Sequence, residues 1–426
     1  MPSLTEQLVQ FIEAKPISEA DLEKASHYVL DALANTRAGQ STEPGRIIRA
    51  WAEGAGHDAG REAFRLGALT HILEADDLHR ESVTHPGCVV VPAACALAGS
   101  TRADGRAFLT AVLKGFEAMC RIGAAVGPTH YRTWHNTATC GPFGSAYAAG
   151  TLLGLEPRAM VHALGNAGTQ SAGLWEFIAS GAMSKHLHAG RAAEAGVVAA
   201  ELAAHGFTGA PSILEGPRGF FAAACPDADP EAVLRAPEAP WQLHRTSIKP
   251  WPSCRHTHPA IDAALELAPQ VDRFRRVEAR TYGAAVDVCD NVRPSTEYEA
   301  KFSLQHCIAA ALIDKEVVFA SFGTTARARH ADLASQIELA SGSPYDEAYP
   351  RAWGASVRVV LEDGRVLEAE RKHALGDPDA PLSPHRLEAK ARDLLALSGV
   401  DPEPLVNQVR ALSAGGSPAG LADPVA

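Results

Sequence analysis

The first half of the chain repeats apolar residues at a helical spacing. Apolar positions recur every three or four residues in residues 17–39, 60–77, 89–100, 105–126, 141–154, 157–174 and 190–206. This spacing predicts helices in those stretches. Ser18 followed by Asp21 predicts the start of one helix and Gly39 its end. Because small residues dominate several of these helix faces, we expect the helices to pack closely around one core.

The pattern changes near Pro240. Residues 276–290 alternate as a strand would, and residues 355–372 read as a hairpin with Asp363 and Gly364 in the turn. Helical stretches at 259–268 and 299–314 lie between them, and a last helix is expected at 383–399. The sequence therefore predicts a mainly α protein with an α+β second domain. We place the helical domain at 1–246, completed by about 384–426, and the α+β domain at 247–383.

Composition excludes several classes of protein. The chain has 426 residues with a net charge of −11, and no basic run supports binding of nucleic acid. No apolar run reaches the roughly 20 residues of a membrane span, and the start of the chain does not resemble a secretory signal. The eight cysteines contain no CxxC pair, which favours reduced thiols over disulfides or a thiolate zinc site. We expect a cytoplasmic protein.

Polar residues suited to chemistry gather in four segments. Residues 74–87 join acidic side chains to two histidines between two predicted helices, and residues 129–139 crowd hydrogen-bond donors before a helix start, as an anion pocket would. Residues 180–191, if helical, place Lys185, His188 and Arg191 on one face, although a solvated basic face has the same pattern. Residues 247–262 hold Lys249 in an extended stretch fixed by prolines. Taken alone, each histidine of residues 129–139 is more often structural than catalytic.

The spacing of possible ligands does not favour a metal ion. The acidic segment matches neither HExxH nor an EF-hand loop, and Cys254, His256 and His258 lack a partner cluster. We therefore expect no metal ion.

Four segments resemble signature sequences of the MmgE/PrpD family. They are THPGCVVVPAACALA at 84–98, the stretch from GAMSKH to GFF at 181–221, SIKPWPSCRHTHPAIDAAL at 247–265 and PSTEYEAKFSLQHCIAAAL at 294–312. The resemblance runs in order from about residue 5 to residue 400. It implies a large all-helical domain with a smaller α+β lid domain and an active site in the cleft between them. It also implies a cofactor-free homodimer that acts on small di- or tricarboxylates by proton transfer next to a carboxylate.

The resemblance assigns residues to this site. Positions similar to the catalytic residues of the family are His85, His135, Lys185, Lys249, Asp76 and Asp77. Expected substrate-binding residues are Tyr131, Ser184, His188, Arg191, Cys254 and His256. The chemistry fits these residue types, because histidine is a base near neutral pH and lysine can hold carboxylates and stabilise the charge of an aci-carboxylate. A lysine from each domain would couple closure of the lid to substrate.

Several activities remain open within the family. A dehydratase-like lyase is the leading hypothesis, and an epimerase of the iminodisuccinate type is the alternative. A cis-aconitate-type decarboxylase is less favoured, because this chain has EADDLHRES where such enzymes have a DFDDT segment, and Asp290 where they have a tyrosine. A non-catalytic binding protein is disfavoured by the joint presence of His85, His135, Lys185 and Lys249.

Overall fold

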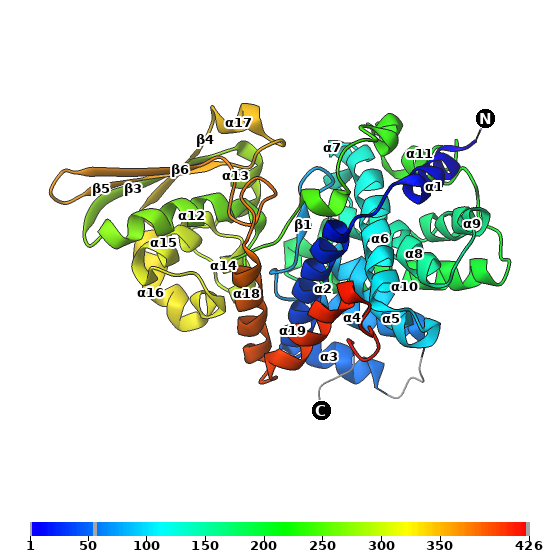
Figure 1. The fold of residues 1–426 in the computed structure, drawn as a ribbon. Helices are drawn as coiled ribbons and strands as arrows, with labels where there is room; N and C mark the ends of the chain where they lie inside the picture. The colour runs from blue at the N-terminus through cyan, green and yellow to red at the C-terminus, as the bar shows by residue number, and fades with distance from the viewer. Residues whose placement is uncertain (1, 54–57, 423–426) are drawn as a thin grey trace. The chain divides into compact units, whose positions relative to one another are not determined.

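The computed structural model describes residues 2–53 and 58–422, which divide into two compact units (Figure 1). Unit 1 contains the chain up to Ile248 and from Ser383 onward, and unit 2 contains Lys249–Leu382. None of the helices in the described residues combines the length and the apolar character needed to cross a membrane.

Unit 1 is built mainly from helices. Among its described residues, the strands are β1 (Leu78–His79) and β2 (Thr246–Ser247), which form a short antiparallel pair. Its longer helices are α1 (Leu4–Ala14), α2 (Glu19–Gly39), α3 (Glu43–Ala52), α4 (Ala59–Thr70), α5 (Gly87–Thr101), α6 (Gly105–Ala125), α8 (Asn136–Leu152), α9 (Pro157–Gly168), α10 (Ser184–Ala204), α18 (Pro384–Leu397) and α19 (Pro402–Ala411). Short helical turns, α7 (Pro128–Tyr131), η1 (Trp175–Ser180), α11 (Phe220–Ala224), η2 (Pro230–Leu234), η3 (Gln242–Arg245) and η7 (Leu412–Ala414), connect them.

Close packing of α8 against α10 and α6 forms the centre of this core. A Cβ atom on Gly141 would lie 2.8 Å from that of Ala192, and one on Gly196 would lie 2.3 Å from the backbone nitrogen of Ala146. Such approaches exclude any larger side chain, because interiors are packed without spare volume. The small-residue faces therefore serve the core of unit 1, as the sequence predicts.

Helix boundaries agree with the sequence at some ends and differ at others. Ser18 caps α2 in a reciprocal capping box with Asp21, and α2 ends at Gly39, as predicted. Several boundaries were predicted wrongly. Helix α9 ends at Gly168 rather than at Leu174, and α10 begins at Ser184 rather than at Gly190. Helix α4 ends at Thr70 rather than near Asp77, which releases the acidic segment as a loop, and α8 begins at Asn136 rather than at Gly141. Residues 136–139 of the donor-rich segment 129–139 therefore form the first turn of α8.

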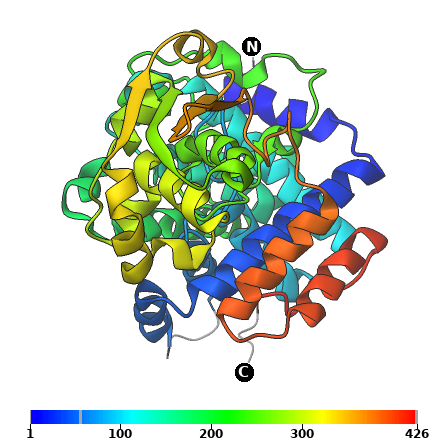
Figure 2. The ribbon, with the colours of Figure 1, turned by 90° about the vertical axis from the view of Figure 1, so that its left-hand side faces the viewer.

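The C-terminal helices return to the first part of the chain. Helix α18 packs beside α2 (Figures 1 and 2, orange against blue). Lys390 of α18 pairs with Asp31 of α2 and donates a hydrogen bond to the carbonyl oxygen of Ala75 at 2.6 Å. This contact ties α18 to the loop that follows α4.

Unit 2 is a four-stranded sheet covered by helices. The strands β3 (Phe274–Thr281), β4 (Ile337–Ser341), β5 (Ala355–Leu361) and β6 (Val366–Arg371) lie in the order β4-β3-β5-β6, with only the β3–β4 pair parallel. Helix α12 (His258–Leu267) packs on β5 and β6, and α15 (Leu304–Asp314) packs on α12. The remaining helical segments are α13 (Gly283–Cys289), α14 (Glu297–Lys301), α16 (Thr324–Ala334), α17 (Tyr345–Ala348), η4 (Arg255–Thr257), η5 (Ala268–Gln270) and η6 (Phe319–Phe322).

This arrangement confirms an α+β second part with the predicted hairpin, in which Gly364 takes a φ of +88°. The strand predicted over 276–290 is wrong beyond Thr281, where the chain turns into α13. The side chains buried there are Ala285 and Cys289, which are four residues apart. This is the spacing of the buried face of a helix, not of one face of a strand. The helix predicted over 299–314 is broken by Ser303, which caps α15.

Candidate active site

The loop between α4 and α5 carries the first polar segment into the interior of unit 1. Asp76, Asp77 and His79 are each at most 2% exposed, and Glu74 adopts the left-handed conformation with a φ of +58°. A non-glycine residue pays a conformational penalty there, and such positions concentrate at functional sites. The loop is therefore a buried part of unit 1 with a defined conformation, not a solvent-exposed connection between two helices.

Asp77 fixes the end of this loop to the start of α5. Both of its carboxylate oxygens accept from the backbone N–H of Gly87 at 3.0 Å. Burial, followed by the neighbouring charges of Asp76 and Asp31, raises the pKa of Asp77 well above its ordinary value. Its contacts are those of a residue that anchors a helix terminus.

His85 is held in one tautomer by the same loop. Its Nδ1 lies 2.6 Å from the carbonyl oxygen of Asp77 and 3.5 Å from a carboxylate oxygen of Asp76. A carbonyl oxygen only accepts, so Nδ1 carries a proton and Nε2 is the nitrogen that can exchange one.

His135 lies at the N-cap of α8 and is 1% exposed. Its ring lies 4.6 Å from the ring of Trp175, and its Nδ1 lies 3.3 Å from Nδ1 of His188. Burial, followed by the charges of His71, Lys185, His188 and His85, lowers the pKa of His135 well below 6.5. The imidazole is therefore neutral at physiological pH, which is the form that can accept a proton.

Lys185 lies in the first turn of α10 and forms an ion pair with Glu74. Their side chains are 7% and 2% exposed. The charge of Lys185 contributes to lowering the pKa of three neighbouring histidines, which places it within the same cluster. These are His135, His186 and His188.

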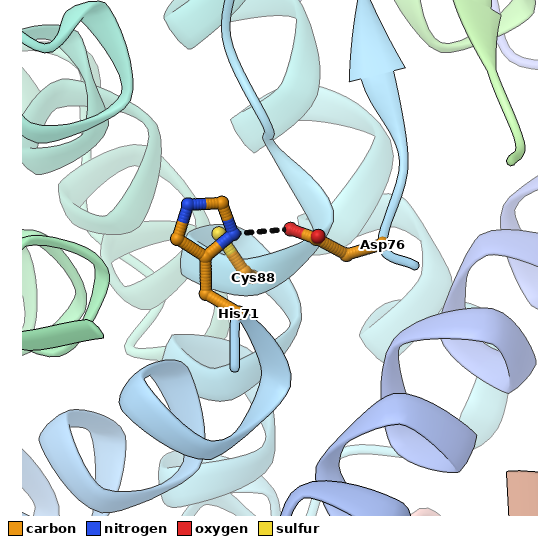
Figure 3. A group of neighbouring side chains, drawn as sticks. All are labelled: His71, Asp76 and Cys88. Atoms are coloured by element: carbon orange, nitrogen blue, oxygen red, sulfur yellow. Dashed lines mark hydrogen bonds and ion pairs between the residues drawn. The ribbon is translucent and has the colours of Figure 1, made fainter. Parts of the chain in front are cut away.

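His71, Asp76 and Cys88 form a further group of neighbouring buried side chains (Figure 3). Nδ1 of His71 lies 2.6 Å from Oδ2 of Asp76, with Cys88 beside the pair. One potential ligand atom from each residue lies within 4.8 Å of the others, a spacing compatible with a metal ion. However, burial and then the charges of Asp76 and Asp77 raise the pKa of the Cys88 thiol well above its usual range. Metals bind the thiolate, so we interpret the three residues as a hydrogen-bonded network.

Three of the four predicted substrate-binding residues of unit 1 lie around a cavity of about 790 Å³, and Tyr131 is not among its lining residues. Ser184, His188 and Arg191 line it, and Tyr131 packs edge-on against Trp175 at 5.3 Å. Residues 184–191 are helical, as expected, because they begin α10. However, Lys185 and Arg191 do not share one cationic face. Lys185 is buried against Glu74, whereas Arg191 is exposed and pairs with Glu194 at 2.5 Å.

The predicted residues of unit 2 gather among aromatic rings. Lys249 is 1% exposed. Nδ1 of His256 lies 2.6 Å from the hydroxyl of Tyr282, and its ring stacks on Trp353 at 4.5 Å. Burial and then the charge of Lys249 lower the pKa of His256 to about 4. The backbone N–H of Cys254 bonds to the carbonyl oxygen of Lys301 at 2.9 Å.

Two family models cover most of this sequence. The MmgE/PrpD N-terminal domain matches residues 6–233, and the MmgE/PrpD C-terminal domain matches residues 251–407. The chain belongs to the MmgE/PrpD family.

Proteins similar to this chain within the MmgE/PrpD family include cis-aconitate decarboxylases. Cis-aconitate decarboxylase from Aspergillus terreus is 25% identical over 416 residues, covering 88% of this chain and 84% of that protein. Its human counterpart is 27% identical, covering 78% and 71%. The cis-aconitate decarboxylase-like protein oryM from Aspergillus oryzae is 26% identical, covering 95% and 92%.

Sequence reasoning missed several residues of this MmgE/PrpD site. His71, Glu74, Trp175 and His186 all contact or electrostatically influence the predicted residues. His71 stands in an apolar helical stretch that looks like core, five residues before Asp76. His71 is a polar residue that directly follows an apolar helix and precedes an acidic segment. That position is the sequence signal that would have marked it as a candidate site residue.

Proposed function

We propose that this protein is a dehydratase-like lyase that acts on a small di- or tricarboxylate by removing a proton next to a carboxylate. The observation that carries the proposal is the buried imidazole of His135, whose pKa is lowered by burial and by nearby charges that include Lys185. Proton abstraction needs a base that is unprotonated at the working pH, and the resulting aci-carboxylate needs a fixed positive charge.

In the proposed reaction, His135 takes the proton from the carbon next to the carboxylate. The electrons of the broken C–H bond spread onto that carboxylate, and Lys185 stabilises the added charge. The C–O bond at the adjacent carbon then breaks, and the departing hydroxide receives a proton from Nε2 of His85, which enters this step as an imidazolium protonated on both nitrogens, to leave as water. Electrons and protons balance without any redox partner.

The ion pair between Lys185 and Glu74 refines this proposal. Lys185 holds a protein carboxylate before any substrate enters. We propose that a substrate carboxylate competes with Glu74 for the ammonium group, so part of the binding free energy is used to replace one carboxylate by another. Lys249 remains a proposed carboxylate-binding residue on the strength of the family resemblance.

Epimerisation is the second candidate, and a specific observation favours it. The rings of His85 and His135 both contact His71, one edge-on and one stacked. They belong to different elements, which is compatible with two bases that approach one carbon from different sides. The names of the relatives favour decarboxylation instead, but Asp290 is bonded to Gln305 at 2.6 Å where those enzymes are expected to have a tyrosine.

Product analysis separates these activities. Purified protein is incubated with a panel of hydroxy- and amino-substituted di- and tricarboxylates, and products are followed by NMR. A lyase of the proposed type yields an unsaturated carboxylate and water, an epimerase yields the other stereoisomer, and a decarboxylase yields carbon dioxide. The proposal fails if carbon dioxide or only the stereoisomer forms.

We also propose that the protein is a homodimer. The family resemblance implies this oligomeric state, but the small-residue helix faces do not argue for it because they are used inside unit 1. Exposed apolar side chains near the cavity support it instead, since soluble monomers rarely group such residues. These are Leu174, Ile178, Met183 and Leu187, each at least 45% exposed. Light scattering at micromolar concentration tests it, and a monomeric mass rejects it.

A further inference from the structure

The hydroxyl group of Tyr282 is a buried polar group that the proposed reaction does not use. Tyr282 directly follows β3 and is 0% exposed, and its hydroxyl lies 2.6 Å from Nδ1 of His256. That nitrogen is the only hydrogen-bond partner of the hydroxyl among the described residues. Burial, as the largest cause, raises the pKa of Tyr282 well above 10, so the phenol keeps its proton at physiological pH. A buried hydroxyl proton needs an acceptor.

This contact decides which nitrogen of His256 carries a proton. If Nδ1 were protonated, it would donate to the phenol oxygen, and the phenol proton would have no acceptor in the part of the chain that the structure describes. If Nδ1 is unprotonated, the phenol donates to it and both groups are satisfied. A neutral His256 therefore carries its proton on Nε2.

His256 is neutral and its ring is held in place. Burial and then the charge of Lys249 lower the pKa of His256 to about 4, well below physiological pH. Its ring stacks on Trp353 at an angle of 8°, and Tyr282 itself stacks on Tyr349 with centroids 4.7 Å apart. Nε2 of His256 has no hydrogen-bond partner among the described residues, yet it is not fully buried. It is therefore the nitrogen that a ligand can reach.

We propose that Tyr282 is a positioning residue whose hydroxyl donates to Nδ1 of His256, so that the Nε2–H group of a neutral His256 is a fixed hydrogen-bond donor to a substrate carboxylate. The inference rests on the proposed function for the identity of the substrate. The direction of the hydrogen bond stands on unit 2 alone.

The charge beside His256 indicates the class of ligand. Lys249 lies close enough to influence the pKa of His256, so a second positive charge on the imidazole would be repelled. A neutral N–H group can lie beside an ammonium group without that repulsion. Together, the two groups offer N–H donors and one positive charge, which match the two acceptor oxygens of a carboxylate. His256 thus binds the substrate as a donor and does not take its proton.

The binding test removes one hydroxyl group at a time. Tyr282→Phe keeps the aromatic ring and deletes the donor to His256. Tyr349→Phe is the matched control, because its ring stacks on Tyr282 and its hydroxyl forms no hydrogen bond among the described residues. The probe is tricarballylate, a tricarboxylate without a hydroxyl group to eliminate, and calorimetry measures its dissociation constant.

We expect Tyr282→Phe to raise the dissociation constant about tenfold, the size of one hydrogen bond to a charged group. Tyr349→Phe should leave the constant unchanged. No binding by wild type, equal constants for wild type and Tyr282→Phe, or equal weakening in both variants overturns the carboxylate site.

Histidine NMR separates this inference from the proposed function. In protein labelled with ¹⁵N at histidine, the signals missing from His256→Gln identify His256. At neutral pH we expect a protonated Nε2 and an unprotonated Nδ1 in wild type and in Tyr349→Phe, and a mixture of the two tautomers in Tyr282→Phe. This readout needs neither turnover nor a ligand. A wild-type His256 protonated on Nδ1, or a tautomer that Tyr282→Phe leaves unchanged, overturns the inference even if the enzyme is a lyase.

Discussion

The ammonium group of Lys185 is paired with the carboxylate of Glu74 inside unit 1, with both side chains less than 8% exposed. Glu74 reaches it from a left-handed backbone conformation at the start of the acidic loop. A charge that the family resemblance assigns to the substrate is thus paired with a carboxylate of the protein. Under the proposed function, we expect substrate binding to rearrange this pair.

Removal of Lys185 alone should affect both stability and binding. Lys185→Met leaves a buried carboxylate without its main counter-charge, which costs about 3–5 kcal/mol of unfolding free energy. The double variant Lys185→Met/Glu74→Gln should recover most of that free energy but keep a strongly raised KM. Denaturant unfolding and steady-state kinetics measure the two effects. A double variant with wild-type KM would show that Lys185 serves only to pair Glu74.

Loss of the base should appear in kcat. We expect His135→Asn to lower kcat by about 10²–10⁴-fold with KM nearly unchanged, the usual size of general acid–base catalysis. His85→Asn should match it in an epimerase, because each direction needs both groups, and should be milder in a lyase. A His135→Asn variant with normal kcat and a lowered melting temperature would show that His135 has only a structural role.

Chelation should leave activity intact. We expect EDTA to have no effect on turnover, because the thiol of Cys88 is held in its protonated form next to His71 and Asp76. Cys88→Ala serves as the control, since it removes the third potential ligand. Loss of turnover with EDTA, recovery with one divalent metal, and no recovery in Cys88→Ala would together establish a metal centre at this position.

Stability should fall as the pH is lowered below 6.5. Burial, as the largest cause, lowers the pKa of His79 and of His186 to about 3 in the folded protein. The unfolded chain then binds more protons below pH 6.5, so unfolding free energy is fully present above that pH and is lost toward pH 3. Each histidine contributes about 1.4 kcal/mol per pH unit in this window.

The variant His79→Gln isolates one of these contributions. Its unfolding free energy should depend less steeply on pH between 6.5 and 4.5 than that of wild type, measured by urea unfolding at several pH values. Equal slopes for the two proteins would mean that His79 is not buried in its neutral form.

Local signals in the sequence were enough to predict much of the fold. Ser18 and Asp21 define a helix start by side-chain hydrogen bonds within four residues, and Asp363 with Gly364 defines a tight turn. The end of α4 was predicted wrongly because apolar residues continue past Thr70 into Ile72 and Leu73, where the chain has already turned.

The site was harder to predict because its contacts join distant positions. Lys185 and Glu74 are 111 residues apart, so no spacing rule could pair them. His71 resembles a core residue in sequence, and only the folded loop brings Asp76 to its ring. Conversely, the cluster of His85, His135 and Lys185 was predicted from a resemblance, and the structure brings these residues into one cluster of unit 1 with His71 at its centre.

The central claim is that a histidine in unit 1 removes a proton next to a carboxylate. Incorporation of solvent deuterium at that carbon tests it most directly, with mass spectrometry of recovered substrate and product in heavy water for wild type and His135→Asn. We predict that wild type labels the carbon next to the carboxylate and that His135→Asn, while still folded and able to bind substrate, does not. Turnover of the substrate without label at that carbon in wild type, or equal labelling by His135→Asn, would contradict the account.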